Sequence, residues 1–151
     1  MNLLKRCQTY FIAATLALYA LSCAADDKKE AVAMVKAAVD FMKKNGKDKL
    51  LENINAGHKD FRQGDVYAFV YALDGTTLAH PTNPKLVGKN LLNVPDPNGR
   101  LFRKEIIDTA IAKGSGWVDY KYLNPETRKI EEKTTYFEKA ADVVIACGIY
   151  K

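Results

Sequence analysis

The spacing of apolar residues changes near residue 60, from a helical period to an alternating one. Between residues 27 and 45, apolar side chains recur every three or four positions and lysines fall largely on the opposite side. This pattern is typical of an amphipathic helix of about five turns. A shorter segment of the same kind covers residues 48–56. We therefore expect a long helix and then a short one before the first strand.

From Val66 onward, β-branched and aromatic residues fill short segments that end at turn residues. We expect a loop over residues 81–97, with one helical turn inside it, and a helix over residues 100–113. The expected strands are residues 66–73, 76–79, 116–123, 129–138 and 142–150. Short turns join the last three strands, so these should form an antiparallel meander. The sequence predicts an α+β fold in which a five-stranded antiparallel sheet carries the long N-terminal helix on one face.

The first 25 residues have the pattern of a targeting segment. Lys5 and Arg6 precede an apolar run over residues 11–21, and small residues follow. We expect residues 1–24 to be a signal peptide and residues 25–151 to form one domain, located in the periplasm or outside the cell. Two alternatives stay open: acylation of Cys23, as in a bacterial lipoprotein, and retention of the segment as a membrane anchor.

Charge and cysteine content narrow the classes of function. The chain has 23 Lys and Arg residues against 18 Asp and Glu residues, and two of the basic residues lie in the first 24. The basic residues are scattered, which argues against binding of nucleic acid. Cys147 lies in the apolar run "DVVIACGIY" and is expected to be a buried thiol. There is no Cys/His cluster, nucleophile motif or phosphate loop, so we predict no metal, no cofactor and no enzymatic activity.

Three segments of the chain resemble one known family. The segments "YAFVYALDGTTLAHPTNPKLVGKNL", "GWVDYKYLNPETRKIEEKTTY" and "CGIY" together resemble the single Cache domain, type 2, a PAS-like extracellular sensor module of bacterial chemoreceptors and histidine kinases. The resemblance runs from about Asp27 to the end of the sequence. It implies that a loop and helix insertion covers the second face of the sheet. It also implies a pocket for a small organic acid, often a two- or three-carbon carboxylate, between that face and the insertion.

Receptors of this family continue beyond the "GIY" motif into a membrane helix and an output domain, whereas this sequence stops at Lys151. We therefore expect a free-standing secreted form without its own transmembrane output. The expected partners are a small organic acid and a membrane receptor or sensor kinase. A homodimer through the N-terminal helix is an open option. The alternative function is that of a periplasmic adaptor that contacts a receptor or envelope protein.

Alternation along the first strand separates two kinds of side chain. Tyr67, Phe69 and Tyr71 share one face, and the small aliphatic residues between them share the other. The aliphatic face suits close helix packing, and the aromatic face suits the wall of a pocket. The candidate ligand-binding residues are side chains that can donate hydrogen bonds to a carboxylate: Tyr71, His80, Arg103, Tyr120, Lys133 and Tyr136.

Several of these assignments have alternatives that the sequence leaves open. His80 could cap loop carbonyls, and Arg103 could form a surface ion pair. Strict alternation keeps Trp117 and Tyr120 on opposite faces, and the resemblance favours Tyr120. The resemblance implies that both Lys133 and Tyr136 line the pocket, but alternation also separates these two unless a bulge intervenes.

Overall fold

The computed structural model describes residues 26–151, so the expected signal peptide lies outside the described residues. Residues 26–45 are helical, and two further α-helices, one 3-10 helix and six strands follow. The elements are α2 (Lys47–Asn55), β1 (Arg62–Gln63), β2 (Val66–Ala72), β3 (Thr77–Ala79), η1 (Pro84–Leu86), α3 (Phe102–Lys113), β4 (Ser115–Leu123), β5 (Ile130–Ala140) and β6 (Val143–Tyr150). The predicted helices and all five predicted strands are therefore confirmed, with small shifts at their ends.

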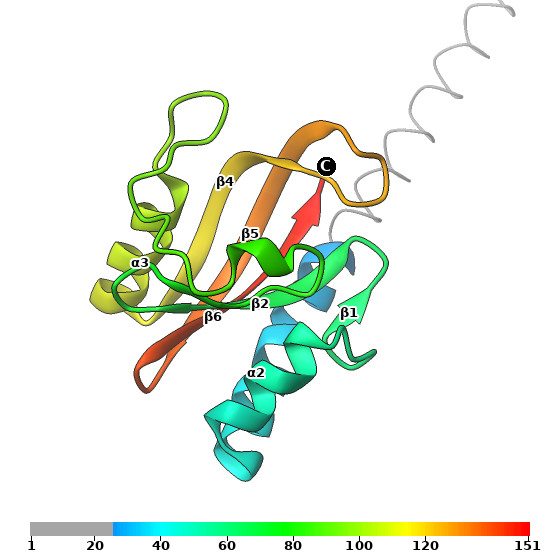
Figure 1. Ribbon diagram of the computed structural model, residues 1–151, viewed down its shortest axis with the longest axis vertical. Coiled ribbons are helices and arrows are strands. Elements are labelled where there is room, and N and C mark those ends of the chain that lie inside the picture. Colours follow the sequence, from blue (N-terminus) through cyan, green and yellow to red (C-terminus); the bar gives the residue numbers. More distant parts are fainter. Residues whose placement is uncertain (1–25) are drawn as a thin grey trace, which may run out of the picture.

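The strands form one antiparallel sheet in the order β1-β2-β6-β5-β4, and β3 pairs with β2 off this path (Figure 1). The sheet has six strands where the sequence predicts five, because β1 is only two residues long. Two residues are too short for alternation to be visible. The last strand, β6, lies at the centre, where it pairs with β2 on one side and with β5 on the other.

One face of the sheet is covered by helix 26–45 and α2 (Figure 1). Ala68 and Val70 of β2 face these helices and share a core with Ile145 and Cys147 of β6. Small side chains on the sheet let a helix approach closely, so the predicted aliphatic face for helix packing is confirmed. Cys147 is fully buried, and its Sγ lies 3.6 Å from Sδ of Met34.

The burial of Cys147 gives a direct test of this core. Burial raises the pKa of the Cys147 thiol to about 12, so the thiolate that reacts with alkylating reagents is scarce at neutral pH. We expect the native protein to resist a thiol reagent at pH 7.5 and the protein in denaturant to react fully. Mass spectrometry of the two samples measures the labelled fraction at this position. Rapid labelling of the native protein would contradict the packing of β6.

The second face is covered by α3 and by the long connection between β3 and α3, residues 80–101 (Figure 1). Tyr67, Phe69 and Tyr71 of β2 point to this side, where they share a core with Phe102 and Ile106. The domain therefore has two cores, one on each face of the sheet. The first is aliphatic, and the second is rich in aromatic rings.

Two anchors hold residues 80–101 against the sheet. The loop pairs with β3 through hydrogen bonds from Thr77 N–H to the Lys89 carbonyl (3.0 Å) and from Gly88 N–H to the Thr77 carbonyl (2.8 Å). Farther along, the Asp96 carboxylate accepts backbone hydrogen bonds from Asn98 and Arg100 in the loop and from Lys121 on the edge strand β4, at 2.8–2.9 Å. One carboxylate therefore links the end of the loop to the sheet. These anchors fix the entry to α3.

Candidate ligand-binding site

Lys133 occupies the centre of the aromatic face. Its side chain is 1% exposed, and its Nζ lies 2.8 Å from the hydroxyl of Tyr67 and 3.3 Å from that of Tyr150. The rings of Tyr67, Tyr150, Tyr122 and Phe69 surround the same nitrogen, with ring centroids 3.9–5.7 Å away. Among residues 26–151, Lys133 has no carboxylate within ion-pair distance. Burial lowers the pKa of Lys133 to about 7.

The path of the Lys133 side chain depends on a glycine in the neighbouring strand. Lys133 lies on β5, and its methylene chain crosses β6 over Gly148, a position that pairs with Tyr67 on one side and Thr135 on the other. A methyl group placed on Gly148 would overlap Cε of Lys133 and lie 2.6 Å from Oγ1 of Thr135. The absence of a side chain at position 148 therefore creates the channel that Lys133 fills.

Arg103 supplies a second buried cation from the first turn of α3. Its side chain is 5% exposed, and its guanidinium carbon lies 4.2 Å from the ring centroid of Phe102. Nη1 donates a 3.3 Å hydrogen bond to the carbonyl of Val94, and the buried Nε has no hydrogen-bond partner in the described chain. No carboxylate of the described residues pairs with it, so the alternative of a surface ion pair is wrong.

His80 follows β3 and is 4% exposed between the rings of Tyr67, Phe69 and Tyr122. Its Nδ1 accepts a 3.2 Å hydrogen bond from the backbone N–H of Asn83, which places the proton of the neutral ring on Nε2. Burial, and then the charges of Lys133 and Arg103, lower the pKa of His80 to about 3. At neutral pH, His80 is a neutral hydrogen-bond donor that also holds the start of the loop.

The predicted tyrosines divide between the two faces. Tyr71 and Tyr120 are buried on the aromatic face, and the Tyr120 hydroxyl lies 2.9 Å from Oγ1 of Thr135. The Tyr120 ring stacks on Phe102 at 3.9 Å between centroids. Burial raises the pKa of both tyrosines above their usual range, so both hydroxyls keep their protons. The preference for Tyr120 over Trp117 agrees with this placement, because Trp117 is 38% exposed on the other side.

The structure does not bring Tyr136 to this site. β5 pairs with β6 in unbroken register from Lys133 to Ala140, so alternation holds and Tyr136 faces the helices. Its hydroxyl donates to Glu138 at 2.7 Å, and its ring packs 5.2 Å from that of Trp117. The expectation that Lys133 and Tyr136 share one pocket is therefore corrected in favour of Lys133.

Four residues at this site were missed as candidates. Alternation along the strand places Tyr122 on the same face as Tyr120, so the sequence alone could have identified Tyr122. Tyr67 shares its face with Tyr71 in the same way. Tyr150 and Gly148 lie in the "CGIY" segment. Their roles follow only from the register between β5 and β6, which brings position 150 opposite Lys133.

Two surface clefts border this group of side chains at Tyr122, and Tyr122 and Leu123 line both of them. The first has a volume of about 400 Å³ and is lined by His80 and the loop beside it, together with the β4–β5 turn. The second has a volume of about 250 Å³ and is lined by Arg103, Phe102 and the loop that precedes α3. One cleft therefore reaches His80 and the other reaches Arg103, and Tyr122 borders both.

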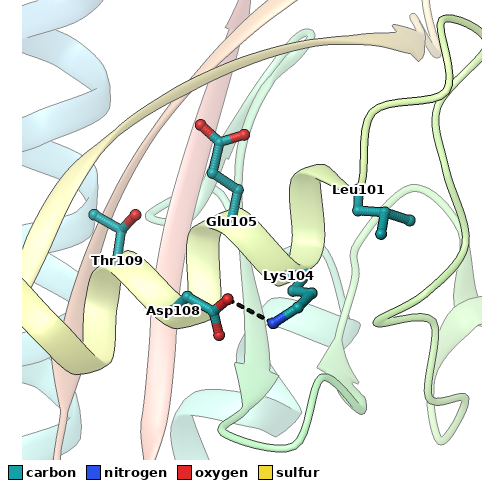
Figure 2. A pocket seen from close by; sticks show the side chains of 5 residues that line it. All are labelled: Leu101, Lys104, Glu105, Asp108 and Thr109. Carbon is teal, nitrogen blue, oxygen red and sulfur yellow. Dashed lines mark hydrogen bonds and ion pairs between the residues drawn. The ribbon is translucent and has the colours of Figure 1, made fainter.

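A third depression lies on the outer surface of α3 (Figure 2). Its charged side chains are already paired with protein groups: Lys104 with Asp108 at 2.7 Å, and Glu105 with Arg100 at 2.7 Å. Both pairs are exposed to solvent, and neither contains a buried charge without a partner. The aromatic face of the sheet is therefore the better candidate for a binding site.

The sequence of residues 25–151 matches the family model dCache_2, described as a Cache domain. The chain belongs to the Cache family. Cache domains are extracellular or periplasmic ligand-binding domains of chemoreceptors and sensor kinases, so the predicted family and general function are confirmed at that level. None of the helices described between residues 26 and 151 is long and apolar enough to cross a membrane.

Among curated proteins, this Cache domain is 39% identical over 72 residues to the sensor histidine kinase MctS of Rhizobium johnstonii, covering 48% of this chain and 15% of that protein. It is 30% identical over 88 residues to the methyl-accepting chemotaxis protein McpP of Pseudomonas putida, covering 57% of this chain and 16% of that protein. The chain thus spans about a sixth of these relatives. A solved methyl-accepting chemotaxis protein from Vibrio parahaemolyticus is 25% identical, with a TM-score of 0.75 over 90% of this chain and 96% of that one.

Proposed function

We propose that this Cache domain binds a small monocarboxylate of two or three carbons between the aromatic face of the sheet and residues 80–101. The observation that carries the proposal is the pair of buried cationic side chains, Lys133 and Arg103, neither of which has a carboxylate partner in the described chain. A buried charge without a partner costs several kcal/mol. A bound carboxylate supplies the missing negative charge.

The neighbouring side chains suit the rest of such a ligand. A carboxylate has about four acceptor positions and needs several donors once water is removed. The Nε2–H of His80 and the hydroxyls of Tyr67, Tyr71 and Tyr122 are available beside the two cations. The aromatic rings suit a short apolar tail, and the dense packing around Lys133 favours a ligand of few atoms. We also propose that the domain lies outside the cytoplasm and acts through a membrane receptor or sensor kinase.

A thermal-shift screen of small organic acids tests the proposal, with the amide of each acid as the matched uncharged control. A ligand at 100 times its Kd adds about 2.7 kcal/mol to the free energy of unfolding, which gives an easily measured rise in Tm. We expect acetate, propionate or a related acid to raise the Tm and its amide to have no effect. If no acid binds at millimolar concentration, the carboxylate proposal fails. The alternative function, an adaptor that contacts a receptor or envelope protein, then takes its place.

The pKa of Lys133 predicts a specific pH dependence of binding. A carboxylate binds the protonated amine, so it raises the pKa of Lys133 above its ligand-free value of about 7. Affinity should be full below pH 7 and fall by up to tenfold per pH unit above it, until the pKa of the complex is reached. Calorimetric titration between pH 6 and pH 9 should also detect proton uptake on binding above pH 7.

His80 should contribute nothing to this pH profile, because its pKa is about 3. The variant His80→Gln keeps an N–H donor and should show weaker binding with an unchanged midpoint. An affinity that is constant from pH 6 to pH 9 would contradict the role of Lys133. If the pH dependence of the affinity is lost in His80→Gln, the group that titrates is the histidine and not Lys133.

A further inference from the structure

The Lys133 amine has surroundings that suit covalent chemistry as well as charge pairing. It is enclosed by rings, it has no carboxylate beside it in the described chain, and two phenol hydroxyls lie within 3.3 Å. An amine with a free lone pair in such a place is a nucleophile toward carbonyl carbon. We propose that Lys133 reversibly captures the carbonyl carbon of a small 2-oxo acid as an imine. This inference rests on the proposed function and narrows its ligand class.

Two opposing effects decide the charge of the amine. Each ring that faces Lys133 stabilises the ammonium form by roughly 0.5–2 kcal/mol. Burial without a counter-ion costs several kcal/mol and is the larger effect. The pKa of about 7 leaves about half of the amine neutral at pH 7. An ordinary lysine, with a pKa of about 10.4, is neutral in fewer than roughly one molecule in a thousand at that pH.

The chemistry balances without an oxidant or reductant. The lone pair of Nζ attacks the carbonyl carbon, the C=O π electrons move to oxygen, and transfer of the amine proton to that oxygen gives a carbinolamine. Loss of the hydroxyl group with one further nitrogen proton releases water and forms the C=N bond. Addition of water reverses both steps. The acid's carboxylate remains unchanged in these steps. It pairs with the protonated amine in the non-covalent complex, and it is left to Arg103 in those molecules whose Lys133 amine is neutral and reacts.

The tyrosines beside Lys133 can assist the proton transfers. The Tyr67 hydroxyl lies 2.8 Å from Nζ, and burial raises the pKa of Tyr67 to about 12. Tyr67 therefore keeps its proton at neutral pH and can donate it to the departing hydroxyl group. Arg103 and Lys133 share Tyr122 as a neighbour: Nζ of Lys133 lies 5.6 Å from its ring centroid, and Arg103 lines a cleft together with Tyr122. A three-carbon 2-oxo acid has its carbonyl and carboxylate on adjacent atoms, so it can present one group to each.

Reductive trapping tests the proposal. Purified protein is incubated at pH 7 with pyruvate and sodium cyanoborohydride, which reduces an imine to a stable amine, and intact mass and peptide mapping locate the adduct. We expect a single adduct on Lys133, formed on the order of a hundredfold faster than on any exposed lysine. Lactate has no ketone and should slow trapping by competition. Lys133→Met should remove the adduct, and Tyr67→Phe should slow its formation, whereas Tyr136→Phe on the opposite face should not.

The outcomes separate this inference from the proposed function. If lactate and pyruvate bind in calorimetry but no adduct forms on Lys133, covalent capture is refuted and carboxylate binding stands. Adducts spread evenly over exposed lysines refute it equally, because they show that Lys133 has no special reactivity. If neither acid binds and no adduct forms, the inference and the proposed function both fail. Protein unfolded in denaturant should lose the preference for Lys133.

Discussion

Lys133→Met should abolish carboxylate binding while making the domain more stable. The substitution removes the amine that would meet the ligand's charge, which should weaken binding by a factor of hundreds or more. It also removes a group whose pKa is about 7 in the folded protein and about 10.4 in an unfolded chain. Below pH 7 this difference opposes folding by an amount on the order of a few kcal/mol, and the penalty fades as the pH rises toward 10. Methionine fills a similar volume without a charge.

Two measurements check this prediction. Calorimetry with the best acid from the screen gives the loss of affinity, and urea unfolding at pH 6 and pH 10 gives the change in the free energy of unfolding. The matched control is Lys139→Met, an exposed lysine on the same strand, which should alter neither quantity by much. A Lys133→Met variant that is folded and binds like wild type would refute the charge assignment. A variant that is less stable at pH 6 would contradict the energetic cost of the buried amine.

Gly148→Ala should weaken carboxylate binding at least tenfold, although it leaves every donor side chain in the protein. The added methyl group overlaps the methylene chain of Lys133 and crowds Thr135, so Lys133 must leave its channel. The amine then no longer reaches Tyr67 and Tyr150. We expect at least a tenfold loss of carboxylate affinity and a fall of about 1–3 kcal/mol in the free energy of unfolding from overpacking.

A double-mutant cycle shows whether the effect acts through Lys133. The stability cost of Gly148→Ala is measured in the wild-type background and again in a Lys133→Ala background, where the channel is empty. The cost should be clearly smaller in the second case, because the methyl group then meets only Thr135. An equal cost in both backgrounds would show that Gly148 matters for the backbone of β6 and not for the lysine. Unchanged affinity in Gly148→Ala would contradict the channel itself.

Much of the fold could be predicted because local pattern and tertiary packing agree. Alternation along β2 separates aromatic from small side chains, and the helices pack where the small residues are. Short turns join the last three strands, which predicts that neighbouring strands run antiparallel, and the structure has this arrangement. The strand β1 could not be predicted, because its two residues are a strand only through their pairing with the beginning of β2.

The residues of the candidate site were predicted in part, and the differences between prediction and structure have physical causes. The resemblance to the Cache family favoured Tyr120 and implied both Lys133 and Tyr136. Tyr136 is excluded once the register is known to lack a bulge. The neutral state of His80 depends first on its burial and then on the charges of Lys133 and Arg103, which lie on other elements, so no local pattern contains it. The role of Gly148 depends on a side chain that crosses from the next strand. Such effects arise from register and burial, so they appear only in three dimensions.

The central position of β6 has a consequence for how the chain folds. β2 pairs with β6 along residues that lie about eighty positions apart, for example Tyr67 with Gly148. Contacts of such long range must wait until both strands are available, and they slow folding relative to local contacts. During synthesis, β2 has no central partner until β6 has been made, so the aromatic face and its lysine cannot assemble gradually. Binding competence should therefore arrive in a single late step, together with closure of the sheet.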